Sequence, residues 1–323
     1  MTEIKVELTR RAALLGAGGV LAGASLTGIG TAHAAAEKQG TAPVPIARYQ
    51  LGAFEINTLH DGAVSLTEPQ KTFAMNVDED TFSATNDENF LPDDSFQISF
   101  TPTLVNTGNE LILFDTGNGE GARPGRGHMR TALMNAGYTP EQVDVVVLTH
   151  MHPDHISGLM EGGAPAFPNA RYVTGRKEYD FWAAMEPETN GVTKLMASHV
   201  KPLADKMTFL EDGGAVASGI TAMAAHGHTP GHTIFLMESD GKQLALTADT
   251  ANHYVWSLAH PEWEVRFDMD KEAAAATRKA VFGMLAADKI PFVGYHMPFP
   301  AVGYVDTNGD GFRYVPASYQ LQL

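Results

Sequence analysis

The chain has 323 residues, with 38 acidic and 22 basic side chains and a formal net charge of −16. This balance argues against nucleic acids and anionic membrane surfaces as partners, because both carry negative charge. The sequence contains no cysteine, so a bound metal ion would have to be held by imidazole and oxygen ligands.

The first 34 residues have the pattern of an export signal. Arg10 and Arg11 precede an apolar, glycine-rich run over residues 12–30, and Ala32-His33-Ala34 has the small-x-small pattern of a cleavage site. This order predicts a twin-arginine signal over residues 1–34, with a membrane anchor as the alternative. We therefore expect a periplasmic or secreted protein that has no stable membrane association after cleavage.

The rest of the chain is predicted to be a leader followed by one large domain. Residues 35–48 are polar and contain proline, which predicts a flexible leader, and residues 49–323 are long enough for a single domain with a full core. Residues 78–94 are rich in Asp, Asn and Ser and predict a surface loop. Residues 306–311 imitate the start of a calcium-binding loop, but Ala317 stands where a bidentate Glu is required, so a hairpin turn is predicted.

Strands dominate both halves of the domain, and each half is accompanied by helices. Helical spacing predicts helices over residues 129–136, 176–185, 192–200 and 271–287. Short apolar runs predict strands over residues 101–106, 111–114, 145–148, 171–174, 220–225, 233–237, 243–247 and 290–294. The pattern favours an α/β fold in which two sheets pack face to face with helices outside, a four-layer αββα sandwich.

One cluster of metal-ligating side chains directly follows the apolar run 145–148. It reads His-Met-His-Pro-Asp-His and contains His150, His152, Asp154 and His155. An extended chain points alternate residues to one side, so the first three are expected to converge beyond the strand end, with His155 on a diverging direction. Imidazole and carboxylate groups both ligate zinc-like ions, and such a dense polar cluster is hard to explain as packing.

Three later segments each deliver polar side chains at the end of an apolar strand. His228 lies in a histidine-rich turn and precedes Thr-Pro-Gly, Asp249 follows the strand 243–247, and His296 follows the strand 290–294. Each of these is a weak signal when taken alone, because a polar residue at a strand end usually has an ordinary hydrogen-bond partner.

Taken together, these motifs resemble the metallo-β-lactamase superfamily, and specifically its dinuclear hydrolase branch. The resemblance runs over nearly the whole chain after the signal, from Asp115-Thr116-Gly117 to the segment 294–300. The stretch from Asp249 through residues 267–278, together with His296-Met-Pro-Phe-Pro, is most similar to methyl parathion hydrolases and related exported lactonase-like enzymes.

The resemblance implies two divalent metal ions, zinc by preference, with manganese, iron or cobalt as alternatives. It implies that Asp249 bridges them and that a metal-bridging hydroxide is the nucleophile; a shared anionic ligand offsets the repulsion between two cations. The resemblance assigns one ion to His150, His152 and His228, and the other to Asp154, His155 and His296.

Further residues receive roles beside this centre. Asp154 is expected to act in catalysis, by orienting the hydroxide or moving its proton. Asp115 and His232 are expected to hold ligating imidazoles in the correct tautomer. His226 could compete with His228 as a ligand, but the resemblance places the ligand immediately before Thr-Pro-Gly.

Three residues are predicted to line the substrate pocket. Trp182 is expected to form part of the pocket wall, as an aromatic residue does in the methyl parathion hydrolase branch that the chain resembles. Packing in the core is the alternative. His253 and Tyr254, just beyond Asp249, are expected to reach the leaving group, with ordinary surface positions as the alternative. The chain departs from acyl-homoserine lactonases at Asn252, because those enzymes carry a tyrosine three residues after the bridging Asp.

The resulting hypothesis is an exported dinuclear hydrolase that acts on a small molecule, namely a neutral ester, lactone or phosphotriester. An iron-dependent oxidoreductase of the same fold and a non-catalytic metal-binding protein are the alternatives. A β-lactam hydrolase is disfavoured by the carboxylate of Asp249, which the familiar β-lactamases of this fold lack. A homodimer is compatible with the sequence, which gives no direct sign of the oligomeric state.

Overall fold

The computed structural model describes residues 44–318, which belong to one compact unit. The predicted export signal and most of the predicted leader lie outside the described residues. The first strand begins at Ile46, so the prediction of a flexible leader as far as residue 48 is wrong for its last three residues. Hydrogen bonding to the next strand orders them despite their polar neighbours, because Ile46 pairs with Leu59.

The first sheet has seven strands and is half antiparallel and half parallel. In spatial order its strands are β1 (Ile46–Leu51), β2 (Phe54–Leu59), β5 (Thr103–Asn106), β6 (Leu111–Phe114), β7 (Val145–Leu148), β10 (Arg171–Gly175) and β11 (Met207–Leu210). The pairs from β1 to β6 are antiparallel, and those from β6 to β11 are parallel. Strand β7 is buried on both faces, as its unbroken apolar run indicates.

The second sheet also has seven strands. They are β12 (Ala215–Ala217), β13 (Ile220–Ala224), β14 (Thr233–Ser239), β15 (Lys242–Ala248), β16 (Phe292–Gly294), β17 (Val302–Asn308) and β18 (Gly311–Pro316). Strands β17 and β18 form the hairpin predicted for residues 306–311, because Asn308 pairs with Gly311 across the turn. The alternative of a calcium-binding helix–loop–helix is therefore excluded at this position.

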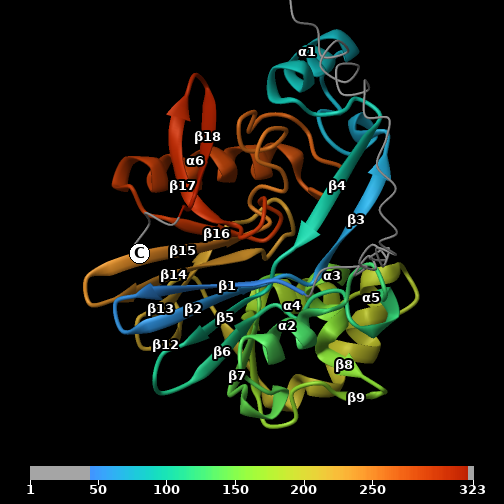
Figure 1. Cartoon of the computed structure of the whole chain (residues 1–323). Coiled ribbons are helices and arrows are strands. Elements are labelled where there is room, and N and C mark those ends of the chain that lie inside the picture. Colours follow the sequence, from blue (N-terminus) through green and yellow to red (C-terminus); the bar gives the residue numbers. More distant parts are fainter. Residues whose placement is uncertain (1–43, 319–323) are drawn as a thin grey trace, which may run out of the picture. The chain divides into compact units, whose positions relative to one another are not determined.

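The two sheets pack against each other, and helices cover their outer faces (Figure 1). Apolar side chains of both sheets meet in the central layer, where the rings of Phe114 and Phe235 lie 5.2 Å apart. Helix α2 (Met129–Asn135) and helix α4 (Arg176–Ala183) pack on the first sheet, and α6 (Lys271–Asp288) packs on the second. The predicted four-layer αββα sandwich is confirmed.

An additional substructure lies beside the sandwich. Strands β3 (Gly62–Thr67) and β4 (Ser95–Phe100) form a two-stranded ribbon, which reaches toward α1 (Glu79–Asn89) in Figure 1. The prediction of a surface loop over residues 78–94 is therefore wrong. The Asp78 side chain accepts a hydrogen bond from the Thr81 backbone and begins the helix, and Phe82 packs against Trp256. Few apolar residues mark this helix in the sequence.

The remaining elements are short and connect the layers. They are α3 (Pro153–Ile156), α5 (Gly191–Leu195), a π-helical turn (Met196–Val200), the strands β8 (Met160–Glu161) and β9 (Ala164–Pro165), and 3-10 turns at Pro69–Lys71, Glu120–Ala122, Pro140–Gln142, Ser157–Leu159 and Lys201–Lys206. Within residues 44–318, every helix is too short or too polar to cross a lipid bilayer.

Candidate metal centre

The histidine-rich cluster lies where strand β7 gives way to helix α3. His150 and His152 follow the strand, and Pro153 begins the helix that carries Asp154 and His155. Proline is favoured in the first turn of a helix, since its missing N–H has no partner to lose there. The helix starts before the extended alternation can reach Asp154, so the expected convergence of Asp154 with His150 and His152 is wrong. Asp154 instead belongs to the same group as His155.

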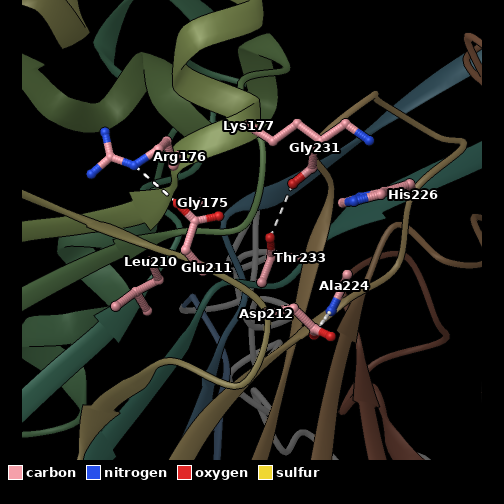
Figure 2. A pocket seen from close by; sticks show the side chains of 10 residues that line it. All are labelled: Gly175, Arg176, Lys177, Leu210, Glu211, Asp212, Ala224, His226, Gly231 and Thr233. Carbon is pink, nitrogen blue, oxygen red and sulfur yellow. Dashed lines mark hydrogen bonds and ion pairs between the residues drawn. The ribbon is translucent and has the colours of Figure 1, made fainter.

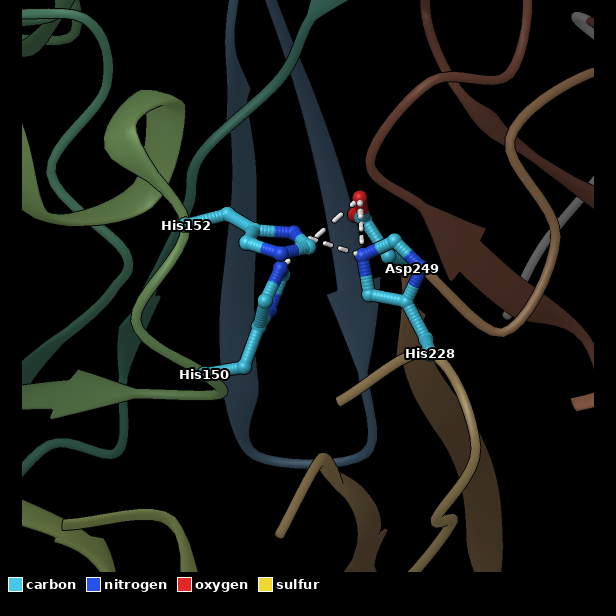
Figure 3. Close-up of side chains that lie close together, drawn as sticks. All are labelled: His150, His152, His228 and Asp249. Atoms are coloured by element: carbon cyan, nitrogen blue, oxygen red, sulfur yellow. Dashed lines mark hydrogen bonds and ion pairs between the residues drawn. The ribbon is translucent and has the colours of Figure 1, made fainter. Parts of the chain in front are cut away.

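Two groups of potential metal ligands share one carboxylate. The first group contains His150, His152, His228 and Asp249, and the second contains Asp154, His155, Asp249 and His296. Within each group, the potential ligand atoms all lie within 4.8 Å of one another. Figure 3 shows the first group, in which three imidazoles and the carboxylate point toward one another from different segments of the chain.

Asp249 lies between the two groups. Its Oδ2 is 3.3 Å from Nε2 of His228 and 3.0 Å from Nε2 of His296, and its Oδ1 is 3.2 Å from Nε2 of His155. The preceding residue, Ala248, has φ of +43°, a left-handed conformation that non-glycine residues seldom adopt. The strand end is thus turned so that this carboxylate reaches both groups.

Three buried atoms at the centre have no hydrogen-bond partner. They are Nε2 of His150, Nε2 of His155 and Oδ1 of Asp249. Buried polar atoms almost always have a hydrogen-bond partner, so three without one at the same centre are suited to bind cations. Imidazole nitrogen and carboxylate oxygen are the ligands that zinc accepts in proteins lacking thiolates. The residues therefore fit two divalent ions.

Burial and the neighbouring carboxylates move the pKa values of the three imidazoles of the first group in opposite directions. Burial lowers the pKa of His150 well below its usual value and that of His152 to about 3. Burial also acts to lower the pKa of His228, but hydrogen bonds to Asp249 and Asp268 outweigh it and raise the pKa to about 9. A site that holds protons against burial carries an excess of negative charge, which bound cations would neutralise.

Each ligating imidazole of the second group is held through its other ring nitrogen. Nδ1 of His155 lies 2.8 Å from Oδ2 of Asp115, and Nδ1 of His296 lies 2.9 Å from the carbonyl of Ser99. Asp115 also accepts hydrogen bonds from the Thr149 backbone and hydroxyl. The structure thus places Asp115 where the sequence predicted, in a position to fix the tautomer of a ligating imidazole.

His228 is held by Asp268, which the sequence analysis did not assign. Nδ1 of His228 lies 2.9 Å from Oδ1 of Asp268, and the other oxygen of Asp268 accepts a 2.7 Å hydrogen bond from Arg278. Arg278 is 1% exposed on helix α6. A buried arginine requires an acidic partner, and Asp268 is that partner. The burial of Arg278 follows from the tertiary structure and has no signal in the sequence.

Glu178 on helix α4 ties together the two loops of the first group. Its Oε1 accepts hydrogen bonds from the Met151 backbone and the Trp182 indole, and its Oε2 accepts them from the Thr229 hydroxyl and the Gly231 backbone. Met151 lies between two histidines of the first group. Glu178 is fully buried, and burial raises its pKa. The spacing of four residues places Glu178 and Trp182 on one face of the helix, and the tertiary structure buries that face.

His232 does not contact a ligating imidazole by hydrogen bonding, so its predicted role is wrong in detail. Its Nδ1 lies 3.0 Å from the carbonyl of Ala225, and its Nε2 accepts a 3.2 Å hydrogen bond from the backbone N–H of Asp249. His232 therefore holds the main chain of the shared carboxylate. The loop after strand β13 brings the ring to this position, which sequence spacing does not reveal.

The three residues predicted to line the substrate pocket face elsewhere. Trp182 is 4% exposed, packs in the core under α4 and donates to Glu178. His253 stacks on Trp256 at 4.0 Å and accepts backbone hydrogen bonds through Nδ1, and burial lowers its pKa to about 3. Tyr254 packs with the aromatic cluster around it. For Trp182 the core-packing alternative therefore holds, and burial of His253 excludes the alternative of an ordinary surface position as well.

A cavity of about 360 Å³ opens on the metal centre. The two-stranded ribbon supplies an apolar wall of four side chains, and Phe267 supplies a fifth. The side chains that line it are Val64, Leu66, Ile98, Phe100, Asn118, Arg126, His152, Pro153, Asp154, Asp249, Asn252, Arg266, Phe267 and His296. Asn252 lines this cavity and donates from Nδ2 to Oδ2 of Asp249 at 3.0 Å.

His226 belongs to neither ligand group. It lines a separate pocket of about 120 Å³, together with Lys177 and Thr233 (Figure 2). The ring instead lies near the carbonyl of His232, at 3.3 Å from Nδ1.

The fold is an αββα sandwich, and two groups of potential metal ligands lie together at one edge of its sheets. This combination is typical of metal-dependent hydrolases. Residues 101–291 match the metallo-β-lactamase superfamily. This match covers more than half of the chain, and the protein therefore belongs to the metallo-β-lactamase superfamily. The predicted family is confirmed.

Individual relatives are lactonases and hydrolases. The chain is 28% identical over 167 residues to an N-acyl homoserine lactonase of Bacillus cereus, a match that covers 51% of this chain and 60% of the relative. The chain thus matches less than two thirds of the length of this curated relative.

Two solved structures are similar over most of the chain. One is AidC, a dizinc quorum-quenching lactonase in complex with a product, with 27% identity and a TM-score of 0.80 over 86% of this chain and 99% of the other. The second is the hydrolase AbOPH of the β-lactamase superfamily, with 25% identity and a TM-score of 0.79 over the same shares.

Proposed function

We propose that the protein is a dinuclear metal-dependent hydrolase that cleaves lactone or ester bonds of small molecules. The observation that carries the proposal is the pair of ligand groups that share Asp249. Three buried nitrogen and oxygen atoms of these groups have no hydrogen-bond partner and lie at the same centre. The relatives and the similar structures are lactonases and hydrolases, which supports the same reaction class.

The residues of the chain divide the work at the centre. His150, His152, His228 and Asp249 would hold one ion, and Asp154, His155, His296 and Asp249 the other. When bound, such ions would lower the pKa of a coordinated water to about 7 and polarise the bond under attack. Asp154 is the partly exposed carboxylate of the centre and lines the cavity, so it is placed to accept and return a proton. The Tyr295 hydroxyl donates to the Asp154 backbone carbonyl at 2.6 Å and holds that segment in place.

The cavity favours a neutral reacting group attached to an apolar chain. Val64, Leu66, Ile98 and Phe100 form one apolar wall, and Phe267 forms another. An apolar pocket with a few polar groups is typical of small-molecule sites. N-acyl homoserine lactones, the substrates named for the relatives, have this chemistry and are the first substrates to test. Phosphotriesters are the second class, because attack by water on a neutral phosphoryl group requires the same centre.

A hydrolysis panel with metal analysis tests the proposal. Purified protein should contain two zinc-like ions per chain and should hydrolyse N-hexanoyl homoserine lactone or an aryl ester. Methyl parathion and a cephalosporin complete the panel. Turnover of the cephalosporin alone would reverse the substrate ranking, and a single iron with no hydrolysis would support an oxidoreductase instead.

We also propose export by the twin-arginine route. Arg10 and Arg11, followed by the apolar run and the Ala-His-Ala pattern, support this proposal. Fractionation of cells that express the full chain tests it, with the double variant Arg10→Lys and Arg11→Lys as the comparison. Equal amounts of both proteins outside the cytoplasm would refute it.

A further inference from the structure

Two cationic side chains of the substrate cavity, those of Arg126 and Arg266, have no carboxylate partner within residues 44–318. Arg266 lies against Phe267, with its Cζ 5.2 Å from the centre of that ring. Arg126 lines the cavity at the metal centre, and within residues 44–318 its guanidinium makes no ion pair. Its Nε donates to Oδ1 of Asn118 at 2.9 Å, and its Cζ lies 6.0 Å from the centre of the Phe100 ring. The remaining N–H groups of this fork are available to a ligand.

The position of Arg126 is fixed by its neighbours. Its backbone forms an isolated bridge with Gly62, where an added Cβ would lie 2.4 Å from the Arg126 Cα. Asn118, which accepts from the side chain, is itself held by Asp61 through its backbone and side-chain N–H groups, both at 2.9 Å. The buried carboxylate of Asp61 also accepts from the backbone of Gly127. A guanidinium held in this way loses little conformational entropy when it binds a ligand.

Arg126 lies at the junction of two cavities. The cavity at the metal centre shares Asn118, Arg126 and Pro153 with a larger cavity of about 820 Å³. The acidic residues of the first cavity are Asp154 and Asp249, whose charge bound cations would offset. In the larger cavity Glu120 is the acidic residue, and it accepts a hydrogen bond from the Gly162 backbone. Arg126 and Arg266 therefore bring positive charge to the lining of the metal cavity in a protein of net charge −16.

We propose that Arg126 selects esters or lactones that carry a terminal carboxylate. The scissile bond lies at the metal centre, an apolar segment of the substrate contacts Phe100 and Ile98, and the carboxylate binds the guanidinium at the junction. This inference rests on the proposed hydrolase function and adds to it the charge of the substrate. A planar guanidinium binds carboxylate through two parallel hydrogen bonds, which neutral chains of the same length cannot form.

Matched esters test the proposal. The substrates are the mono-4-nitrophenyl esters of adipic and suberic acid, compared with 4-nitrophenyl hexanoate and octanoate, which have the same chain lengths. In the wild-type enzyme, kcat/KM should be higher for the carboxylate ester of each pair. Arg126→Gln should lower this preference about tenfold, mainly through KM of the carboxylate ester. Arg313→Gln, an equal change of charge on the exposed hairpin, should leave the preference unchanged.

The outcomes separate this inference from the proposed function. Hydrolysis of the neutral esters without any wild-type preference for the carboxylate esters would overturn the role of Arg126 and leave the hydrolase proposal intact. An unchanged preference in Arg126→Gln would also overturn it. If that variant does not fold, Arg126→Met, which keeps the aliphatic part of the side chain over Phe100, gives the same comparison. If none of the four esters is hydrolysed, both the proposed ester hydrolysis and the proposed role of Arg126 in ester selection are refuted.

Discussion

Glu178 offers the sharpest test of how the metal centre is held together. The variant Glu178→Gln keeps the shape of the side chain and replaces one carboxylate oxygen with an amide. The amide oxygen can still accept from Met151 and Trp182, and the amide nitrogen can donate to the Thr229 hydroxyl once that hydroxyl reverses its role. The backbone N–H of Gly231 is then left buried without an acceptor.

The structure gives the expected order of stabilities. One buried donor without a partner costs about 1–3 kcal/mol, so Glu178→Gln should lower the free energy of unfolding by that amount. Glu178→Ala leaves all four buried donors without this acceptor and, at about 1 kcal/mol or more for each, should lower the free energy of unfolding by at least about 4 kcal/mol. Asp180→Asn, on the exposed side of the same helix, makes the same change of charge and should cost less than about 0.5 kcal/mol.

The assay is urea unfolding of metal-free protein, because bound metal would add its own stabilisation. Zinc affinity, measured against a competing chelator, should fall about 10- to 100-fold in Glu178→Ala, since Glu178 positions the loops that carry His152 and His228. An Ala variant as stable as Asp180→Asn, with unchanged zinc affinity, would refute the reasoning.

Three further predictions concern the ligands and the buried charges. Asp249→Ala should bind fewer than two metal ions and lose at least about 100-fold in turnover, more than loss of an outer partner costs; two retained ions with full activity would contradict the bridging role. Arg278→Met removes the guanidinium from the buried carboxylate of Asp268 and leaves its Oδ2 without a partner, so the free energy of unfolding should fall by about 3–5 kcal/mol in urea titrations; a loss below about 1 kcal/mol would show that water replaces the arginine. His228 has a pKa of about 9 without metal, so below pH 9 zinc must displace its proton and apparent affinity should rise with pH toward 9. Calorimetry in buffers of different ionisation enthalpy measures this proton release, and equal heats would exclude it.

The sequence predicted the metal centre well because its ligands lie at strand ends. His150, Asp249 and His296 each follow an apolar run, and such runs are visible without knowledge of the fold. The seven residues named as ligands are the seven that the structure gathers into two groups. The resemblance placed Asp154 with His155 and His296, and the structure groups these residues together. Strand geometry alone placed Asp154 with His150 and His152, because it does not include the change of direction at the helix that begins at Pro153.

The residues around the metal centre were harder to predict from the sequence than the ligands themselves. His253 and Tyr254 lie next to the metal-binding segment in sequence, yet His253 stacks on Trp256 and both turn away from the cavity. The ribbon that forms the apolar wall of the cavity, with Leu66 and Ile98, is far from every potential ligand in the sequence, and folding brings the carbonyl of Ser99 to 2.9 Å from Nδ1 of His296. Helix α1 lacks an apolar stripe, so its polar composition predicts a loop although the segment is helical.

The sequence by itself determined the αββα class, the donor types and the positions of the metal-binding side chains, because hydrophobic periodicity and clustered imidazoles are local properties of a chain. Only the tertiary structure decided which residues stand around those donors. Glu178, Asp268 and Arg126 take their roles from segments that come together in folding, and the direction of a side chain depends on neighbours that are distant in sequence.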